Sequence, residues 1–281
     1  MDMTGHVLKL PADGRRSGEG GLRTRGQTRA SVDGQPLVTI VTVVLNKARS
    51  IGQTMASVRK QGYANIEYIV IDGGSNDGTV ELIRTHEEAI DYWVSEPDSG
   101  IYDAWNKGVR LANGEWIAFL GAGDTYAPDA VQAYVDFILS QDRGESLHYV
   151  SSRVSLVADG IVKRVIGKPW HWTGFRKYMT VAHVGSFHRK SLYEQYGLYD
   201  TAYRICGDYE LLLRPRDGLR AAFLDRVTAA MDLEGVSNQD PRSFGETMRA
   251  KISTGGRARL ACRIEKWEAI VKWKVRKWTG R

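Results

Sequence analysis

Cysteine is scarce in this sequence, and long apolar runs are missing. Only Cys206 and Cys262 are present, far apart and without metal-ligand spacing, which predicts neither a disulfide framework nor a zinc site. No apolar run approaches the roughly 18 residues that span a bilayer. The stretch from Pro11 to Arg29 is rich in Gly, Arg and Thr, without the apolar segment of a signal peptide. These absences predict a cytoplasmic protein with reduced thiols.

The usual glycine-rich signatures of nucleotide enzymes are also absent. The segment Asp72-Gly-Gly-Ser-Asn-Asp-Gly-Thr79 follows an apolar run, but it is not the Gly-x-Gly-x-x-Gly dinucleotide fingerprint. It also lacks the Gly-Lys-Ser/Thr of a phosphate loop. NAD and ATP chemistry therefore lack their usual signals.

Composition favours one globular core with an appendage at each end. The hydrophobic share of 42% and the charged share of 26% are ordinary for a soluble globular protein. Residues 1–36 predict a flexible leader with a net charge of +2, and residues 37–240 predict the core, at −5. Residues 241–281 hold 12 basic and 3 acidic residues, a net charge of +9. The basic tail is therefore expected to contact an anionic membrane or a nucleic acid.

Strand and helix patterns alternate from Leu37 to about Ser140. Residues 37–45 form a β-branched run, typical of a strand buried on both faces of a parallel sheet. Apolar spacing and turn residues predict helices over 50–61, 77–88, 101–112 and 128–140, and strands over 66–71, 90–94 and 116–120. This alternation predicts an α/β fold with a mostly parallel, right-handed sheet.

The rhythm changes after Leu147. Strand-like segments at 147–157 and 160–166, joined by Asp159-Gly160, predict an antiparallel hairpin. A short helix over 208–216 and a strand over 220–232 follow. The second half of the sheet is therefore expected to be mixed.

The tail from Ser243 to Arg281 has an apolar stripe at helical spacing. The stripe consists of Ile264, Trp267, Val271, Val275 and Trp278, and its flanks carry Lys266, Lys272, Lys274, Arg276 and Lys277. A basic helix with tryptophans on its apolar side suits the headgroup region of an anionic membrane. Packing of the stripe onto the core is the alternative. Ile270 and Trp273 widen the apolar surface and favour the membrane.

Acidic residues stand after three apolar or turn-forming segments. Asp72 follows 66–71, Asp103 follows 95–100, and Asp124 follows 116–120. Because the carboxyl ends of parallel strands meet at one edge, where open α/β folds bind their ligands, we expect these carboxylates to gather there. Such a site suits a nucleotide, a metal and a polar substrate. Asp72 can accept a hydrogen bond from a base or a ribose, and Asp77 is a candidate helix N-cap.

The order and spacing of these segments resemble the family-2 glycosyltransferases, which are inverting, nucleotide-sugar-dependent enzymes with the GT-A fold. The resemblance covers roughly residues 37–240. It rests on the opening strand with Asn46, the Asp72 loop, Gly100-Ile-Tyr-Asp-Ala-Trp-Asn-Lys-Gly108, the turn ending in Asp124, the His183 segment before Phe187, Gly207-Asp-Tyr-Glu210 and Glu234-Gly-Val-Ser-Asn238. The subgroup that the chain is most similar to builds bacterial exopolysaccharide, O-antigen and glycolipid sugars.

The resemblance implies a role for each matching residue. The nucleotide base would be bound by Asp72 with Val43, Asn46 and the backbone near Gly74, and the ribose and sugar by Asp103 and Asn106. Asp124 would ligate a divalent cation, Mg²⁺ or Mn²⁺, on the donor diphosphate. Asp208 would be the catalytic base, with Glu210 as the substitute candidate.

One position departs from the family pattern. Family members commonly have two adjacent acids in the turn where this chain has Gly123 before Asp124. A Gly-Asp variant is familiar in the polysaccharide subgroup, so the departure does not imply inactivity. A single carboxylate with diphosphate oxygens and water suffices for a hard cation.

The implied reaction is a single displacement. Asp208 takes the proton of an acceptor hydroxyl as its oxygen attacks the anomeric carbon, and the cation neutralises the departing nucleoside diphosphate. The anomer is inverted. The expected acceptor is a lipid-linked saccharide or glycolipid at the cytoplasmic face of the membrane.

Three further residues have two interpretations each. His183 would assist the cation or the diphosphate, but a lone histidine is more often structural, and the structural role is preferred. Trp170 and Trp172 either stack on an acceptor sugar or pack against the core.

Two other functions would require different features in the sequence. A sugar-phosphate nucleotidyltransferase would need a glycine-rich basic loop after the first strand, where Leu45-Asn-Lys-Ala-Arg-Ser50 has no glycine. A degenerate sugar-nucleotide-binding module would use the basic tail to bind nucleic acid. The intact set of Asp72, Asp124 and Asp208 argues against degeneration, so no nucleic-acid partner is expected.

Overall fold

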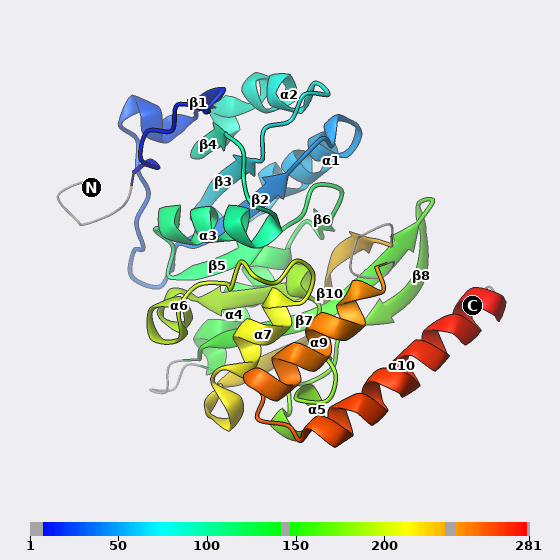
Figure 1. The fold of residues 1–281 in the computed structure, drawn as a ribbon. Coiled ribbons are helices and arrows are strands. Elements are labelled where there is room, and N and C mark those ends of the chain that lie inside the picture. The colour runs from blue at the N-terminus through cyan, green and yellow to red at the C-terminus, as the bar shows by residue number, and fades with distance from the viewer. Residues whose placement is uncertain (1–7, 142–146, 234–239, 280–281) are drawn as a thin grey trace.

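The computed structural model describes residues 8–141, 147–233 and 240–279, in which helices cover both faces of a ten-stranded sheet (Figure 1). The strands are β1 Gly18–Gly20, β2 Val38–Val44, β3 Ile66–Asp72, β4 Tyr92–Ser95, β5 Trp116–Phe119, β6 Thr125–Tyr126, β7 Tyr149–Ala158, β8 Ile161–Ile166, β9 Ser186–Arg189 and β10 Ala221–Asp232. The α-helices are α1 Ala48–Arg59, α2 Thr79–Thr85, α3 Ile101–Leu111, α4 Ala130–Gln141, α5 Trp172–Phe175, α6 Lys190–Tyr196, α7 Gly207–Leu213, α9 Arg242–Ser253 and α10 Arg259–Thr279. Four 3-10 turns, η1 Leu22–Arg25, η2 Glu87–Ala89, η3 His183–Gly185 and η4 Arg216–Gly218, complete the described elements.

The first half of the sheet is parallel, as predicted. The strand order is β1-β4-β3-β2-β5-β9-β7-β10-β6, with β8 paired to β7. Strands β4, β3, β2 and β5 pair in parallel. Nearly every residue of β2 and β3 is buried, which explains why these strands read as continuous apolar runs rather than alternating ones. The loops after these strands therefore leave the sheet at one edge.

The second half of the sheet is mixed, also as predicted. Strand β9 is antiparallel to β5 and to β7, whereas β10 is parallel to β7. The hairpin of β7 and β8 turns at Asp159 and Gly160, whose φ angles of 52° and 72° suit a two-residue hairpin turn. The mixed half extends the sheet away from the parallel strands.

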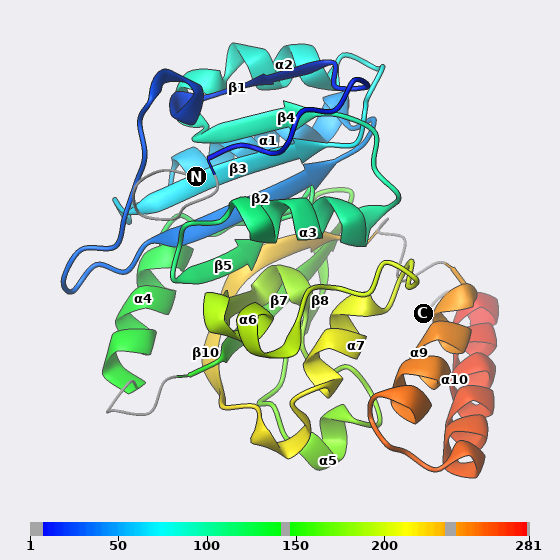
Figure 2. The same ribbon diagram turned by 60° about the vertical axis from the view of Figure 1, so that its left-hand side comes forward.

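Two apolar layers sandwich the sheet between its helices (Figure 2). One layer joins the sheet to α3, α6 and α7, through residues such as Tyr102, Leu192 and Leu211. The other joins it to α1, α2 and α4, through residues such as Ile51 and Tyr134. The short loops at the strand ends are thus held between two packed layers.

The N-terminal segment differs from the flexible leader that the sequence predicted. Of residues 1–36, those from 8 onward have a defined path, and β1 pairs antiparallel with β4, placing Gly18 opposite Ser95. The segment lacks apolar periodicity because backbone hydrogen bonds, rather than a packed face, attach it to the sheet. Gly20 also lies against the Trp93 ring, where a Cβ would come within 2.5 Å of the indole nitrogen.

A buried ion pair fastens the same segment. Arg23 in η1 forms an ion pair with Glu67 of β3, and both side chains are almost fully buried. Arg23 also donates to the carbonyl of Leu111 at 2.9 Å. The Glu67 carboxylate accepts a further hydrogen bond from Thr39 Oγ1 at 2.6 Å and two from Asn113. The Glu67 carboxylate tolerates burial because several donors engage both of its oxygens.

The tail forms two helices rather than one, with a turn at Gly255-Gly256 between them. In the seam between α9 and α10, Lys251 binds Glu265 at 3.0 Å and the Trp273 ring meets Phe244 edge-on. Trp273 therefore belongs to this seam, and does not widen an exposed apolar face as the sequence pattern predicts. No helix among the described residues is long and apolar enough to span a membrane. The expected motif at residues 234–238 lies outside the described residues.

Replacing Arg23 by Ala should strongly destabilise the fold, because Glu67 would be left as an unpaired buried charge. Loss of one partner of a buried pair costs about 3–5 kcal/mol. Urea denaturation measures the change. The matched control is Arg25→Ala, which removes a surface pair with Glu87 and Glu88 and should change stability little. Equal effects of the two variants would contradict the role of the buried pair.

Candidate active site

The carboxylate of Asp72, at the end of β3, organises the first loop of the site. Its Oδ2 accepts the backbone N–H groups of Gly74 at 3.0 Å and Ser75 at 2.9 Å, and the Ser95 hydroxyl at 2.7 Å. Its Oδ1 accepts the Ser75 hydroxyl at 2.5 Å. Asp72 is fully buried. The expected direct contact with a nucleotide base would therefore need some of these bonds to open.

The loop after β2 is tied to the Asp72 loop. Asn46, with a φ of 51°, donates its backbone N–H to the Ser75 hydroxyl at 2.7 Å and accepts the N–H of Asn76 at 3.0 Å. Asp77 accepts the N–H of Ala48 at 3.1 Å, which joins the start of α1 to the same loop. Val43, at the end of β2, is partly exposed beside them. The expected donor residues thus lie on two joined loops.

A third loop, residues 95–103, faces the Asp72 loop. The Asp98 carboxylate lies over Gly73, where a Cβ would come within 2.5 Å of its Oδ2. Burial raises the pKa of Asp98. Gly74, with a φ of 90°, lies opposite Pro97 in ordinary contact distance. Sequence reasoning did not select Asp98, although it stands in the segment 95–100 that precedes Asp103.

Two residues of α3 act on this loop and its surroundings. Asp103 accepts the N–H of Ser99 at 3.0 Å, so it stabilises the turn that begins the helix. Asn106 is buried, and its amide exchanges two hydrogen bonds of 2.9 Å with the backbone of Tyr199. Each end of the amide makes one of these bonds, so Asn106 anchors the Tyr199 segment beside the loop. Its implied contact with the ribose or the sugar stays a prediction.

The turn after β5 brings Asp124 to the edge. Gly123 has a φ of 111°, a conformation that an aspartate at this position would adopt only with strain, which explains the departure from two adjacent acids. The Gly123 N–H donates to Thr54 Oγ1 at 2.9 Å, so α1 supports the turn. Asp124 accepts the N–H of Asp232 at 3.0 Å. Burial raises the pKa of Asp124 to about 7, and the negative charge of Asp232 acts in the same direction.

These oxygen donors suit a hard divalent cation. Two carboxylates, Asp124 and Asp232, lie near one another, and a cation between them would offset their mutual repulsion. No group of three or more potential His, Cys, Asp or Glu ligands occurs in residues 8–141, 147–233 and 240–279. A cation here would therefore take its remaining ligands from the donor diphosphate and water.

Asp208 is the second residue of α7 and is partly exposed. Its Oδ1 accepts the N–H of Tyr209 at 2.9 Å and the Tyr102 hydroxyl at 3.3 Å. Its Oδ2 carries no hydrogen bond within the described part of the chain. Burial raises the pKa of Asp208 to about 6, while the two hydrogen bonds lower it. A carboxylate with one free oxygen and such a pKa suits a general base near neutral pH.

Glu210 is engaged elsewhere. It forms an ion pair with Arg214 at 2.6 Å and accepts the Thr254 hydroxyl at 2.8 Å. Because the Arg214 guanidinium already neutralises its charge, Glu210 is a poorer candidate for a base than Asp208.

His183 lies in an aromatic cluster. Its ring stacks on Trp105 at 4.1 Å between centroids, and its Nε2 is 2.9 Å from the Tyr199 hydroxyl. Burial lowers the pKa of His183 well below its ordinary value, so the ring is neutral. These contacts favour the structural role.

Trp170 and Trp172 border α7. Their rings stack at 6.4 Å between centroids, and Trp170 also meets Phe175, whose carbonyl accepts the Tyr209 hydroxyl at 3.0 Å. Both tryptophans are partly exposed. Both side chains also pack against the core, as one of the two interpretations predicted, and they lie on the segment beside the helix that carries Asp208.

Besides Asp98, the structure adds Tyr102 and Arg204, which sequence reasoning also missed. Tyr102 reaches Asp208 from the start of α3, and its place within Gly100–Gly108 was the available signal. Arg204 donates to the carbonyl of Ser99 and thus joins the segment before α7 to the loop before α3. No sequence motif pointed to Arg204.

Comparison with known proteins gives the site a context. The profile of the family described as Glycosyl transferase family 2 matches residues 39–189. An uncharacterized glycosyltransferase of Mycobacterium tuberculosis is 34% identical over 225 residues, which cover 76% of this chain and 82% of that protein. A PGL/p-HBAD biosynthesis glycosyltransferase of Mycobacterium bovis is 27% identical over 218 residues, covering 72% and 80%. The family match thus runs from β2 to β9.

Solved structures show the same fold. TarS 1-349 of S. aureus in complex with UDP-GlcNAc superposes with a TM-score of 0.64 at 14% identity, covering 83% of this chain and 71% of that one. This chain covers 39% of the longer TarS structure. The mannosyltransferase PcManGT of Pyrobaculum calidifontis, in complex with GDP-Man and Mn²⁺, gives 0.55 at 17% identity, covering 88% and 79%. The fold is therefore GT-A, as predicted, and the family match excludes the nucleotidyltransferase alternative.

Replacing Asp124 by Asn should remove metal-assisted donor binding. With the unaltered chain, Mn²⁺ and the correct UDP-, GDP- or dTDP-sugar together should raise the melting temperature more than either alone, at about 2–4 °C per kcal/mol. Asp124→Asn should lose the metal-dependent part, because an amide is a weaker ligand for a hard cation. Thermal shift measures this, with the exposed Asp129→Asn as the control. A full metal-dependent shift in Asp124→Asn would contradict the assignment.

Proposed function

The chain belongs to glycosyl transferase family 2 and uses a nucleotide-sugar donor, and from that premise we propose that it is an inverting hexosyltransferase. Its acceptor is a lipid-linked saccharide or glycolipid of bacterial cell-surface polysaccharide synthesis. The relative named for PGL/p-HBAD biosynthesis supports a glycolipid acceptor. The partly exposed aromatic pair Trp170 and Trp172 supports a sugar on the acceptor side.

The observation that carries the proposal is the setting of Asp208. One carboxylate oxygen is committed to Tyr102 and Tyr209, and the other remains available for a proton. In the proposed step this oxygen takes the proton of the acceptor hydroxyl while the hydroxyl oxygen bonds to the anomeric carbon. The bond from that carbon to the diphosphate oxygen breaks, and the nucleoside diphosphate leaves. A single displacement of this kind inverts the anomer.

The donor would lie across the joined loops at the sheet edge. Asp72, Val43, Asn46 and Gly74 would form the base pocket, while Asp103 would shape the ribose side through the turn that it stabilises. A divalent cation, Mn²⁺ or Mg²⁺, at Asp124 would supply charge neutralisation for the leaving diphosphate. PcManGT, which shares the fold, was solved with GDP-Man and Mn²⁺.

The exposed stripe of α10 supports attachment to the cytoplasmic face of an anionic membrane. Trp267 is 69% exposed and Val271 is 55% exposed, on the side of α10 away from the seam with α9. The described part of the stripe comprises Leu260, Ile264, Trp267, Val271 and Val275. Arg263 and Lys274 flank it, so apolar insertion and attraction to acidic headgroups would act together. The remaining predicted stripe residue, Trp278, has no described side chain.

Replacing Asp208 by Asn should abolish transfer while donor binding persists. The amide can still accept from Tyr102 and Tyr209 but cannot take a proton, so kcat should fall by about 10²–10⁴-fold. A coupled nucleoside-diphosphate release assay and donor titration measure the two properties. The exposed Asp217→Asn variant is the matched control. Wild-type turnover in Asp208→Asn would disprove the base assignment.

The activity of the unaltered enzyme should fall on the acid side. A general base works only when deprotonated, and the pKa of Asp208 is raised to about 6 by burial. Below that pH, kcat/KM should drop by about tenfold per pH unit. A pH profile at saturating cation tests this. Constant activity down to the ordinary pKa of an aspartate would contradict it.

The double variant Trp267→Glu, Val271→Glu should release the protein from anionic vesicles. Each side chain contributes about 1.5–3 kcal/mol when buried, so binding should weaken by more than tenfold. Co-sedimentation with phosphatidylglycerol vesicles measures it. The control is Ile161→Glu, Val162→Glu, which alters two exposed apolar residues of β8. Equal sedimentation of both variants would rule out the stripe as the attachment surface.

A further inference from the structure

The segment that leads into α7 is held by a carboxylate from α9. Three consecutive backbone N–H groups donate to Glu246: Arg204 at 2.9 Å to Oε1, and Ile205 at 2.8 Å and Cys206 at 2.9 Å to Oε2. Both oxygens of Glu246 are therefore used by the residues directly before Gly207 and Asp208. Hydrogen bonds from backbone N–H groups to an ionised carboxylate are roughly twice as strong as those between neutral groups.

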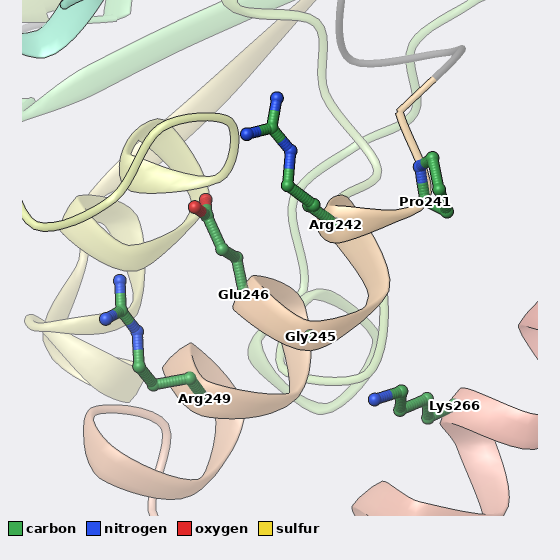
Figure 3. A pocket seen from close by; sticks show the side chains of 6 residues that line it. All are labelled: Pro241, Arg242, Gly245, Glu246, Arg249 and Lys266. Carbon is green, nitrogen blue, oxygen red and sulfur yellow. The ribbon is translucent and has the colours of Figure 1, made fainter.

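Other residues of α9 contact the same segment. Thr247 Oγ1 lies 3.3 Å from the Cys206 thiol, and the Arg249 guanidinium donates to the carbonyl of Ala202 at 2.9 Å. The guanidinium also stacks over Tyr203, 3.7 Å from the ring centroid. Figure 3 shows Glu246 and Arg249 pointing from α9 toward this segment, whereas Lys266 comes from α10. One face of α9 thus contacts residues 202–206.

Asp208 is consequently supported from two sides. Tyr102 of α3 donates to its carboxylate, and the Tyr102 ring packs so closely on Gly207 that a Cβ there would come within 2.8 Å of it. Glu246 holds the opposite side through the backbone. Neither support is close to Asp208 in the sequence.

We propose that Glu246 is a positioning residue for transfer, which fixes the start of α7 and thereby the place of the Asp208 carboxylate. The proposal rests on the proposed function, since it takes Asp208 as the base. It makes α9, which the sequence assigns to an appended basic tail, part of the active site.

The charge of Glu246 has a second effect. Burial raises the pKa of Asp208 to about 6, and the negative charge of Glu246 acts in the same direction. The other titratable groups coupled to Asp208 remain neutral at neutral pH, because burial raises their pKa values; they are Tyr102, Tyr149, Tyr199 and Cys206. Glu246 therefore carries the charge among these groups. Removing that charge should lower the pKa of Asp208 and make it a weaker base.

The test is Glu246→Gln in the full chain. The Gln amide nitrogen would face backbone N–H donors, so at least one of the three hydrogen bonds is lost. We expect kcat to fall by roughly 10- to 100-fold, as for a small misplacement of a reacting group. The donor KM should stay near the wild-type value, and the acid limb of kcat/KM should move to lower pH. Hydrogen exchange of the amides at 204–206 should accelerate.

Two companion variants sharpen the result. Glu246→Asp keeps the charge on a shorter side chain, so it should leave the acid limb in place and be more active than Glu246→Gln. Glu194→Gln removes an exposed carboxylate on α6 and should behave as wild type. If Glu246→Gln does not fold, Glu246→Asp decides alone: faster exchange at 204–206 with lower kcat supports the proposal, and wild-type values of both overturn it.

The remaining outcomes separate positioning from general stability and from the base assignment. Unchanged exchange, or faster exchange with unchanged kcat and pH profile, overturns the proposal. A lower melting temperature with equal losses in kcat and donor affinity indicates a purely structural role and also overturns it. Asp208→Asn is assayed in parallel. If it is active, the proposed function fails; if it is inactive while Glu246→Gln is fully active, only the positioning role fails.

Discussion

The buried carboxylate of Asp72 is the interaction on which the donor edge of the sheet depends. It sits where β2, β3 and β4 end, and its four hydrogen bonds bind the loop after β3 to Ser95 at the end of β4. A buried carboxylate is costly unless it is hydrogen-bonded, so the surrounding loops are constrained to keep these donors in place. Asn46 and Asp77 then join the loop after β2 to the same structure.

Residues from the N-terminal segment and from the C-terminal segment bind the loops of the candidate site. The Ser17 hydroxyl lies 2.7 Å from that of Ser95, which itself donates to Asp72, and Arg16 forms an ion pair with Glu96 at 2.9 Å. Glu246, from the other end, holds the segment before Asp208. The segments that look like appendages in the sequence therefore support the loops of the candidate site, while the outer side of α10 stays exposed.

The sequence predicted the regular elements well, because their apolar patterns are local. The parallel strands, the hairpin at Asp159-Gly160 and the mixed second half were all expected, and the family resemblance was confirmed by the profile match. The N-terminal segment was wrongly expected to be flexible, because strand addition and a single buried arginine leave no periodic signal. Trp273 was also placed wrongly, since helical periodicity does not say which neighbour a face contacts.

In the candidate site too, some features follow from local sequence patterns and others from long-range contacts. The sequence by itself determined which residue types stand at the strand ends, because glycine turns and carboxylates after apolar runs are read from neighbouring letters. Asp72 and Asp124 were found in this way, whereas Asp208 came from the family resemblance. Only the tertiary structure decided what each one contacts. It paired Asn106 with Tyr199, set Asp98 over Gly73, and brought Glu246 to the segment before Asp208 across some forty residues of chain. Such pairings depend on long-range packing of whole helices against a sheet, and no local pattern encodes that packing.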